Sequence, residues 1–323
     1  MSLGTGVDLP AGYEVLDLPA SPALPLSFAR AALRAAGVGG GSRELPRVAY
    51  RLAGVRPDPA HVARYADVVG GPRAGRLPLL YPNALSFPLQ MALMTAPGFP
   101  FPVIGMVHLE NTVRQSRGLV AGTALDLEVR AENLRPHRLG QVLDVVTVVR
   151  QGGHVAWTQV GTFLRRGGSS SNRSSNSPDA ARPAGTGPSP SAPPDDADAA
   201  DQAPLHRIGS WALDAGLGRA YAAAAGDRNP IHLYPLTAKA FGFSRPIAHG
   251  LWTAARLTHA VEAGMPAEVT CVARFRKPVP LPSTVDVLAD RAPGEGAGPV
   301  HAQVRRQDAA GTVCCDLVLR PGP

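Results

Sequence analysis

The sequence predicts an α+β protein made of two similar halves, each a long helix followed by antiparallel strands. Three observations support this prediction. A low-complexity segment divides the chain of 323 residues near its middle. The two flanking halves repeat the same order of helical and β-rich runs. In addition, similar turn signals precede the last strand of each half.

The dividing segment comprises residues 167–203 and reads GGSSSNRSSNSPDAARPAGTGPSPSAPPDDADAADQA. It contains almost no apolar side chain larger than alanine, so it cannot bury enough surface to offset its ordering entropy. We therefore expect a disordered linker. The chain divides into an N-terminal extension (1–44), a first repeat (45–166), the linker (167–203) and a second repeat (204–323).

Each half begins with a helical run that starts at an aspartate and ends at a glycine. These runs extend from Asp58 to Gly70 and from Asp214 to Gly226. Aspartate is a common helix N-cap, and glycine commonly ends a helix in a left-handed conformation. A second, apolar helical segment follows in each half, at residues 80–93 and 246–257.

Alternating apolar and polar residues then predict about four strands in each half. These runs are MVHLENTVR, TALDLEVRAENLR, QVLDVVTVVRQ and HVAWTQVGTFLRR in the first half, and EVTCVARFRKPV, TVDVLADR, PVHAQVRRQD and TVCCDLVLR in the second. Hairpin turns at Gln151–His154 and Asp308–Gly311 precede the last strand of each half. A helix laid across a curved antiparallel sheet buries the apolar face of both. The matching order favours an internal duplication.

Composition narrows the class of protein. Hydrophobic residues make up 45% of the chain, which is typical of soluble globular proteins, and no apolar run is long enough to span a bilayer. The three cysteines lack a C-x-x-C spacing, and the N-terminus lacks the basic region of a secretory signal. We therefore expect a cytoplasmic protein with no disulfide frame and no metal site.

The formal net charge is +7, but the basic residues are scattered. No block of five to eight lysines and arginines is present, so we do not expect a nucleic-acid partner. The charge is consistent with attraction of a phosphate-bearing substrate, and equally with an ordinary basic surface.

The second half contains a candidate pair of acid–base residues. Gly226 and Asn229-Pro230 are turn formers, so Asp227 and His232 should lie in an irregular segment directly after a helix. A carboxylate and an imidazole are well suited to handling a water molecule near neutral pH. The Asn229 amide can hold the turn or the base.

A glycine at the start of a helix supplies the other expected element. Gly250 follows His249 and precedes the apolar segment, where its backbone N–H is free to donate. Such a donor can stabilise a carbonyl oxygen that gains negative charge during a reaction.

These residues resemble the motifs of the MaoC-like, (R)-specific enoyl-CoA hydratases, which have hotdog folds. The resemblance rests on Gly226-Asp227-x-Asn229-Pro230-x-His232 and on Ile247-Ala248-His249-Gly250. The two-repeat chain is similar to double-hotdog 3-hydroxyacyl-thioester dehydratases of actinobacterial type. The expected fold is therefore an α+β double hotdog.

The resemblance implies reversible hydration of a trans-2-enoyl thioester, carried by coenzyme A or acyl carrier protein, with no cofactor. Asp227 and His232 would be the catalytic acid–base pair, in either order, and Gly250 the donor to the thioester carbonyl. The implied residues around the substrate are Asn229, His249 and Thr258, the last being a hydroxyl residue eight positions after the glycine. His249 is expected mainly to pack beside Gly250.

The first repeat reads Gly70-Gly71-Pro72-Arg73-Ala74-Gly75-Arg76 where the second carries the acid–base motif. Aspartate, asparagine and histidine are all missing, so we expect one active site per chain, in a monomer or a homodimer. The alternatives are a non-catalytic acyl-thioester-binding scaffold and a hotdog thioesterase. The intact motif in the second repeat favours the hydratase.

Overall fold

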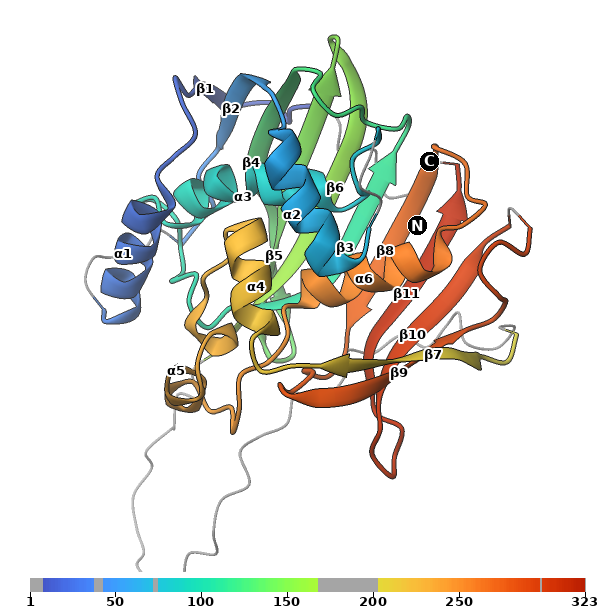
Figure 1. Ribbon diagram of the computed structural model, residues 1–323. Coiled ribbons are helices and arrows are strands. Elements are labelled where there is room, and N and C mark those ends of the chain that lie inside the picture. The colour runs from blue at the N-terminus through green and yellow to red at the C-terminus, as the bar shows by residue number, and fades with distance from the viewer. Residues whose placement is uncertain (1–7, 38–42, 72–74, 168–202, 297, 323) are drawn as a thin grey trace, which may run out of the picture.

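The computed structural model describes residues 8–37, 43–71, 75–167, 203–296 and 298–322, which form one eleven-stranded sheet with helices packed against it (Figure 1). The strand order is β1-β2-β4-β5-β6-β3-β8-β11-β10-β9-β7. The expected linker at 167–203 lies, apart from its two end residues, outside the described residues.

The first repeat contributes five strands and two helices. They are β2 (Val48–Val55), α2 (Pro59–Val69), α3 (Tyr81–Met94), β3 (Val107–Gln115), β4 (Leu125–His137), β5 (Gly140–Gln151) and β6 (His154–Arg166). The glycines of the expected hairpin, Gly152 and Gly153, have φ of 60° and 79° and join β5 to β6. Two consecutive residues with positive φ form the type of turn that fits the twist of a β-hairpin.

The second repeat follows the same plan. Its elements are β7 (His206–Leu213), α4 (Leu217–Ala225), the 3₁₀ helix η2 (Pro230–His232), α5 (Pro235–Ala240), α6 (Gly250–Val261), β8 (Val269–Phe275), β9 (Ser283–Ala289), β10 (Val300–Arg306) and β11 (Val313–Pro321). The expected turn at Asp308–Gly311 connects β10 to β11.

The strand order shows how the two repeats are related. From β2 to β3 the sheet reads β2-β4-β5-β6-β3, and from the opposite edge the second repeat reads β7-β9-β10-β11-β8. The two halves meet where β3 pairs antiparallel with β8, with Asn111 opposite Ala273. The predicted α+β double hotdog is confirmed.

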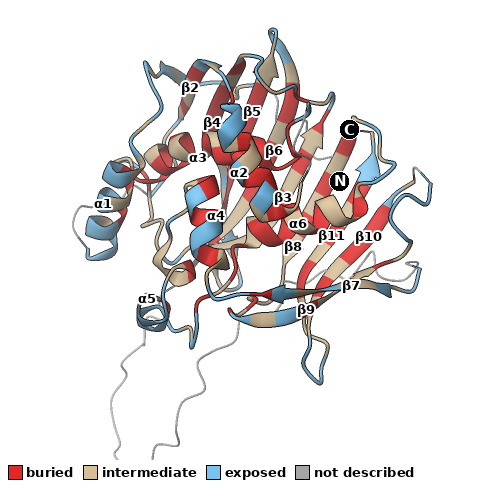
Figure 2. Cartoon of the chain, in the orientation of Figure 1, coloured by how far each residue is buried: buried red, intermediate tan, exposed pale blue. Residues whose placement is uncertain are grey.

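The core lies between the sheet and the second helix of each repeat. α3 packs against β4 and β5, and α6 packs against β10 and β11. Buried residues are concentrated on the strands and on the helix faces turned towards them, whereas the outer faces of α2 and α4 are exposed (Figure 2). The sheet therefore holds both long helices, and helix contacts also cross between the repeats, where α4 packs against α2 and α3 and α2 packs against α6.

The first helices of the two repeats confirm the predicted C-terminal ends. α2 is capped by Asp58, whose carboxylate accepts a hydrogen bond from Ala60 N at 3.0 Å, and it ends at Gly70. α4 ends at Gly226. The predicted start at Asp214 is wrong by three residues, because the Asp214 carboxylate closes a turn onto Gly216 N and the helix begins only at Leu217.

The N-terminal extension adds β1 (Glu14–Asp17) and α1 (Leu24–Ala35). β1 pairs in parallel with β2 at the edge of the sheet, and α1 packs against α3. Within the described ranges, no helix is both long and apolar enough to cross a membrane.

Candidate active site

A single turn carries the aspartate and the histidine predicted as the acid–base pair. Gly226, at φ 81°, ends α4 and turns the chain away from the helix axis. The Oδ1 atom of Asp227 accepts a hydrogen bond from Asn229 N at 3.1 Å, so the carboxylate caps its own turn and leaves Oδ2 for another partner. Asn229 in turn accepts from Ile231 N at the start of η2. The expected holding role of Asn229 in the turn agrees with this geometry.

His232 ends η2 and is buried, with 7% of its surface exposed. Its Nδ1 lies 2.7 Å from the carbonyl oxygen of Ile247. A carbonyl only accepts hydrogen bonds, so Nδ1 must carry the proton. In the neutral ring the Nε2 lone pair is therefore free to accept a proton.

Helix α4 approaches the backbone of His232 through Gly218. A Cβ atom placed on Gly218 would lie 1.9 Å from the carbonyl oxygen of His232. Only glycine allows this contact without a backbone shift. The helix that carries the Gly226 turn at one end thus also supports His232 near its other end, a role that the sequence did not indicate.

His249 contacts both members of the pair. Its Nε2 lies 3.0 Å from the carbonyl oxygen of Asp227 and therefore donates to it. Its ring stacks on that of His232, with the centroids 3.7 Å apart and the planes inclined by 27°. Nε2 also lies 4.0 Å from Asp227 Oδ2. His249 is the residue before the first turn of α6, so its hydrogen bond fixes the N-terminus of this helix beside the Asp227 turn.

Gly250 is the first residue of α6, where a backbone N–H has no carbonyl acceptor within its own helix. A Cβ at this position would lie 3.1 Å from the Phe275 ring. Glycine therefore lets the helix N-terminus and Phe275 approach closely, next to the stacked histidines. This is the position expected for a donor to a substrate oxygen.

Thr258 does not join this group. It lies eight residues after Gly250 on α6, roughly 12 Å along the helix axis at the usual rise per residue. The side chain is buried, and Oγ1 lies 3.6 Å from Cys271 Sγ. The structure thus brings together Asp227, Asn229, His232, His249 and Gly250, and it places Thr258 separately.

Burial shifts the pKa values of the pair towards each other. Desolvation raises the pKa of Asp227, although the His232 charge and the Asn229 N–H act in the opposite direction. Desolvation lowers the pKa of His232, opposed by the Asp227 charge. The pKa of His249 falls well below 6.5, through burial and through the neighbouring His232. Two groups with converging pKa values are suited to exchanging a proton with a bound water.

The same three side chains could in principle ligate a metal, because one ligand atom from each of Asp227, His232 and His249 lies within 4.8 Å of the others. The hydrogen bonds argue for a different use. His249 directs its Nε2–H at the Asp227 carbonyl, so the nitrogen nearest the carboxylate is a donor and has no lone pair to offer. The donor set fits proton transfer better than metal binding.

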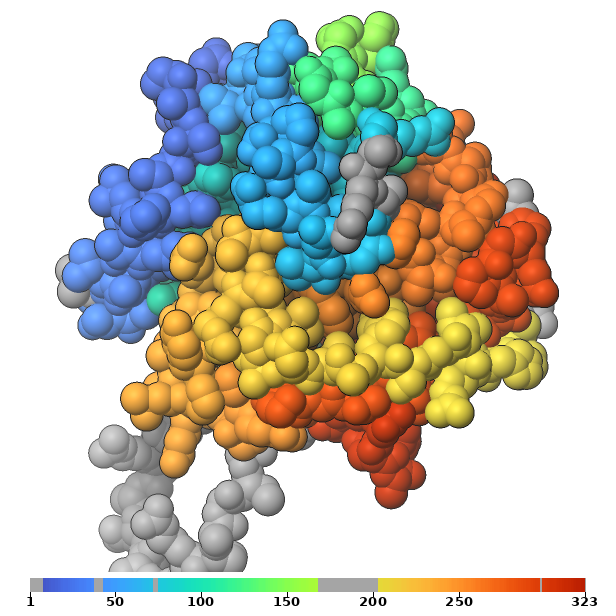
Figure 3. Space-filling view, viewed as in Figure 1, coloured from blue at the N-terminus to red at the C-terminus, as the bar shows by residue number. Residues whose placement is uncertain are grey.

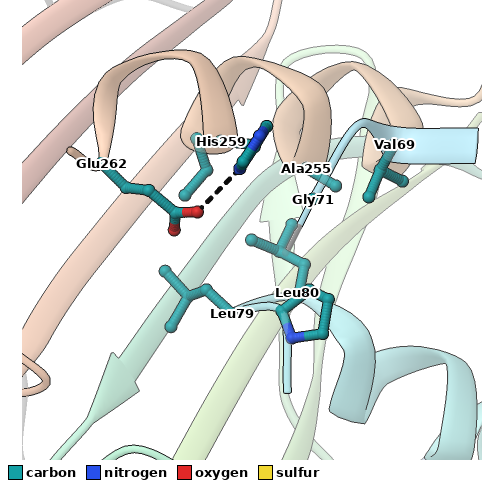
Figure 4. A pocket seen from close by; sticks show the side chains of 9 residues that line it. Val69, Gly71, Leu79, Leu80, Ala255, His259 and Glu262 are labelled. Atoms are coloured by element: carbon teal, nitrogen blue, oxygen red, sulfur yellow. Dashed lines mark hydrogen bonds and ion pairs between the residues drawn. The ribbon is translucent and has the colours of Figure 1, made fainter. Parts of the chain in front are cut away.

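A small hollow lies in the corresponding place beside the first repeat, and residues of both repeats line it, Thr258 of α6 among them (Figure 4). It lies where α2 ends and α3 is about to begin, with Gly71 and Leu80 in the places that Asp227 and His249 take in the second repeat. His259 on α6 and the C-cap residue Glu262 also line it, and their side chains share a hydrogen bond of 2.9 Å. Of the motif-equivalent residues, Pro72, Arg73 and Ala74 lie outside the described residues.

Comparison with known proteins identifies related sequences and structures. Residues 211–304 match the MaoC like domain family. The chain is 40% identical over 253 residues to 3-hydroxyacyl-thioester dehydratase X of Mycobacterium tuberculosis, and the match covers 78% of this chain and 83% of that protein.

Solved structures give the same result. The crystal structure of HtdX of Mycobacterium tuberculosis aligns with a TM-score of 0.68 at 35% identity, covering 84% of this chain and 99% of that one. A MaoC-like dehydratase from Phytophthora capsici aligns with a TM-score of 0.59 at 18% identity, covering 84% and 94% of the two chains, which supports the fold alone. The chain belongs to the MaoC-like dehydratase family.

Proposed function

We propose that this protein is a hydro-lyase that interconverts trans-2-enoyl thioesters and (3R)-3-hydroxyacyl thioesters. One observation carries the proposal. Asp227 Oδ2 and His232 Nε2, two atoms that can each accept a proton, are left available by the hydrogen bonds that hold their side chains in one site. The named activity of the Mycobacterium tuberculosis relative, a 3-hydroxyacyl-thioester dehydratase, supports the same reaction.

In the proposed mechanism, a water molecule donates hydrogen bonds to Asp227 Oδ2 and His232 Nε2. The water oxygen forms a bond to Cβ of the enoyl thioester while the pair takes up one water proton. The double-bond electrons move towards the thioester carbonyl, whose oxygen accepts a hydrogen bond from Gly250 N–H. The pair then returns the proton to Cα, so the product contains one added water and the pair is unchanged. Dehydration is the same sequence in reverse.

The proposed roles differ for the remaining residues. Asn229 maintains the turn, because it accepts the hydrogen bond that starts η2. His249 holds the backbone of Asp227 and the ring of His232 at the edge of the substrate site. Thr258 is proposed to contact the acyl part of the substrate, away from the reacting atoms.

The thioester carrier is proposed to be coenzyme A or an acyl carrier protein. Both are anionic, and the net charge of +7 would favour the approach of either. A comparison of kcat/KM for the same acyl chain on the two carriers would discriminate between them. A cytoplasmic location is also proposed, because the three cysteines, Cys271, Cys314 and Cys315, are buried as free thiols.

We propose that residues 45–166 and 204–323 act together as one catalytic unit. β3 of the first repeat pairs with β8 of the second, so a single chain already joins two hotdog units in one sheet. The unit could therefore work as a monomer, and a homodimer of such units is the alternative. Light scattering coupled to size exclusion would separate the two.

The direct test follows loss of enoyl absorbance with trans-2-enoyl-CoA of short, medium and long chain, and measures free thiol in parallel. We expect hydration of at least one substrate to the 3R product without thiol release. The His232→Gln variant should lose about 10²- to 10⁴-fold in kcat, the usual contribution of a positioned acid–base group. Thiol release would instead indicate a thioesterase. A wild type that is inert on both coenzyme A and carrier-protein substrates would indicate a scaffold.

A further inference from the structure

A series of ring contacts connects the candidate active site with the first repeat. His232 stacks on His249 at 3.7 Å between centroids, and His249 packs against Tyr221 at 4.9 Å. Tyr221 then contacts Tyr65 at 6.0 Å. Tyr221 belongs to α4 and Tyr65 to α2, the two helices that lie side by side between the repeats (Figures 1 and 3). The catalytic histidine is thus three ring contacts from a residue of the repeat that lacks the motif.

His249 depends on these contacts for its orientation. The ring is 98% buried, and Nε2 donates to the Asp227 carbonyl. Its other nitrogen, Nδ1, has no hydrogen-bond partner among the residues that the structure describes. A single hydrogen bond leaves an imidazole ring free to tilt about it, so the rings of His232 and Tyr221 on either side must hold its plane.

Tyr221 in turn is supported from the first repeat. Tyr65 is completely buried and packs edge-on against Tyr81 at 5.3 Å between centroids. The Tyr81 hydroxyl lies 2.7 Å from His61 Nδ1. Residues of α2 and α3 therefore hold the Tyr65 ring on the side away from Tyr221, and both helices belong to the first repeat.

The charge state of the two central tyrosines does not vary in the working range. Burial raises the pKa of Tyr65 above its usual value, and burial together with the neighbouring Tyr65 and the Asp227 charge raises that of Tyr221. Both phenols remain neutral, so the two side chains act through their mutual contact and not through a charge. Aromatic pairs at these separations prefer tilted and edge-on arrangements such as those observed.

We propose that Tyr65 is a positioning residue for the reaction, acting through Tyr221 and His249 on His232. This inference rests on the proposed function of the Asp227–His232 pair. It gives the first repeat a part in the chemistry although that repeat carries no acid–base motif. Removing the Tyr65 ring leaves space into which Tyr221 can move, which releases one side of the His249 ring. His232 would then sample positions in which Nε2 no longer faces the substrate site.

The test compares Tyr65→Leu with Tyr65→Phe and with Phe99→Leu. Phe99 is also completely buried on the first-repeat side, but no ring contact links it to this series. For Tyr65→Leu we expect kcat to fall about 10- to 100-fold with KM changed less than about twofold, since small misplacements of catalytic groups have effects of this size. Tyr65→Phe keeps the ring and should stay within about threefold of the wild type.

A second readout does not require activity. Nitrogen-15 NMR of histidine-labelled protein reports which ring nitrogen of His232 carries the proton. We expect one Nδ1–H form in the wild type, in Tyr65→Phe and in Phe99→Leu, and a mixture of forms in Tyr65→Leu. Thermal unfolding of each variant confirms that the folded protein is observed. If Tyr65→Leu does not fold, Tyr65→Met fills similar volume without a flat ring and replaces it.

The inference is overturned if a folded Tyr65→Leu or Tyr65→Met protein keeps the wild-type kcat and a single His232 form. It is also overturned if Phe99→Leu loses as much kcat as the Tyr65 variant, since the loss would then reflect general destabilisation. These outcomes differ from failure of the proposed function. In that case the wild type itself would hydrate no enoyl thioester, while the NMR comparison would still decide whether Tyr65 orders His232.

Discussion

The two repeats end their first helices in the same way and differ immediately afterwards. α2 and α4 both stop at a glycine in the left-handed conformation, with φ of 71° at Gly70 and 81° at Gly226. The next residue is Gly71 in one repeat and Asp227 in the other. The same backbone turn therefore occurs once in each repeat. The two turns differ in their side chains, and the turn of the second repeat carries groups that can accept a proton.

A second difference lies inside these helices. Three residues before the tyrosine of each repeat stand Val62 in α2 and Gly218 in α4. Val62 is a buried side chain of the core, whereas Gly218 makes room for the His232 carbonyl. The comparison indicates that the second repeat gives up core packing so that the backbone of His232 can approach its helix.

Within this comparison of the two helices, the largest effect is expected for Gly218→Ala. Its Cβ would overlap the His232 carbonyl oxygen, so the segment that carries His232 must move. We expect kcat/KM to fall at least about 100-fold, as for other displacements of a catalytic group. The matched variant Val62→Ala should lower the free energy of unfolding by about 2 kcal/mol through its cavity and leave kcat unchanged. Equal effects of the two variants on kcat would contradict the inferred difference between Gly218 and Val62.

Next in size is an effect on stability alone, in the first repeat. Arg130 and Glu128 form a fully buried ion pair at 2.9 Å on β4. Glu128 also pairs with Arg51 and Arg150 at 3.2 Å, so Arg130→Met does not leave its carboxylate unpaired. The variant removes the buried hydrogen bonds of Arg130 to charged groups, and we expect the free energy of unfolding to fall by about 2–3 kcal/mol in urea titrations.

The control for this prediction is Arg274→Met, which removes a half-exposed pair with Glu110 at 2.9 Å across the β3–β8 junction. Such a pair should contribute less than about 1 kcal/mol. Both folded variants should keep the wild-type kcat. A lower kcat in folded Arg130→Met would mean that the first repeat influences the site through more than the Tyr65 contacts.

A smaller change is expected in the pH profile. The proposed reaction needs a neutral His232, and burial holds the pKa of His232 below 6.5. Activity should therefore persist below pH 6.5, and the acid limb of kcat/KM should have its midpoint below this value, as a property of the coupled pair. In Asp227→Asn the carboxylate no longer raises the pKa of His232, so the limb of the residual activity should move to lower pH. A midpoint above 6.5 in the wild type would contradict the assigned neutral form.

No gain is expected from placing a carboxylate in the first repeat. Gly71→Asp is sterically tolerable, because a Cβ there would lie 3.4 Å from Val69 Cγ2. Added to Asp227→Asn, it should raise activity less than about twofold, since an acid without a positioned base gives little catalysis. Recovery of activity in the double variant would mean that the first repeat retains a working site.

Regular local patterns account for the part of the fold that the sequence predicted. Asp58 and Gly70 bound α2 as expected, and the alternating runs became strands of the sheet. The pairing of β3 with β8, and the edge strand β1 with helix α1, were not predicted. They depend on contacts between distant segments, and neither β1 nor α1 has a strong pattern of its own.

The candidate site was likewise predicted only in its local part. Asp227 and His232 lie only five positions apart in the sequence, which is why the sequence already predicted that they lie together. In the structure, hydrogen bonds of the turn hold both side chains in one site. The stacking of His249 on His232 and the fit of Gly218 to the backbone were not predicted. These contacts join η2 to α4 and to the N-terminus of α6, and they depend on how separate elements pack together.

The central claim is that the Asp227 turn of the second repeat performs the chemistry. The most direct measurement compares kcat/KM of Asp227→Asn with that of Asp214→Asn on the best enoyl thioester. Asp214 precedes the same helix, is not part of the site, and caps a turn that an asparagine oxygen can also cap. We predict a loss of about 10²- to 10⁴-fold for Asp227→Asn and less than about twofold for Asp214→Asn. An Asp227→Asn enzyme as active as Asp214→Asn would show that the turn is only structural and that the chemistry lies elsewhere.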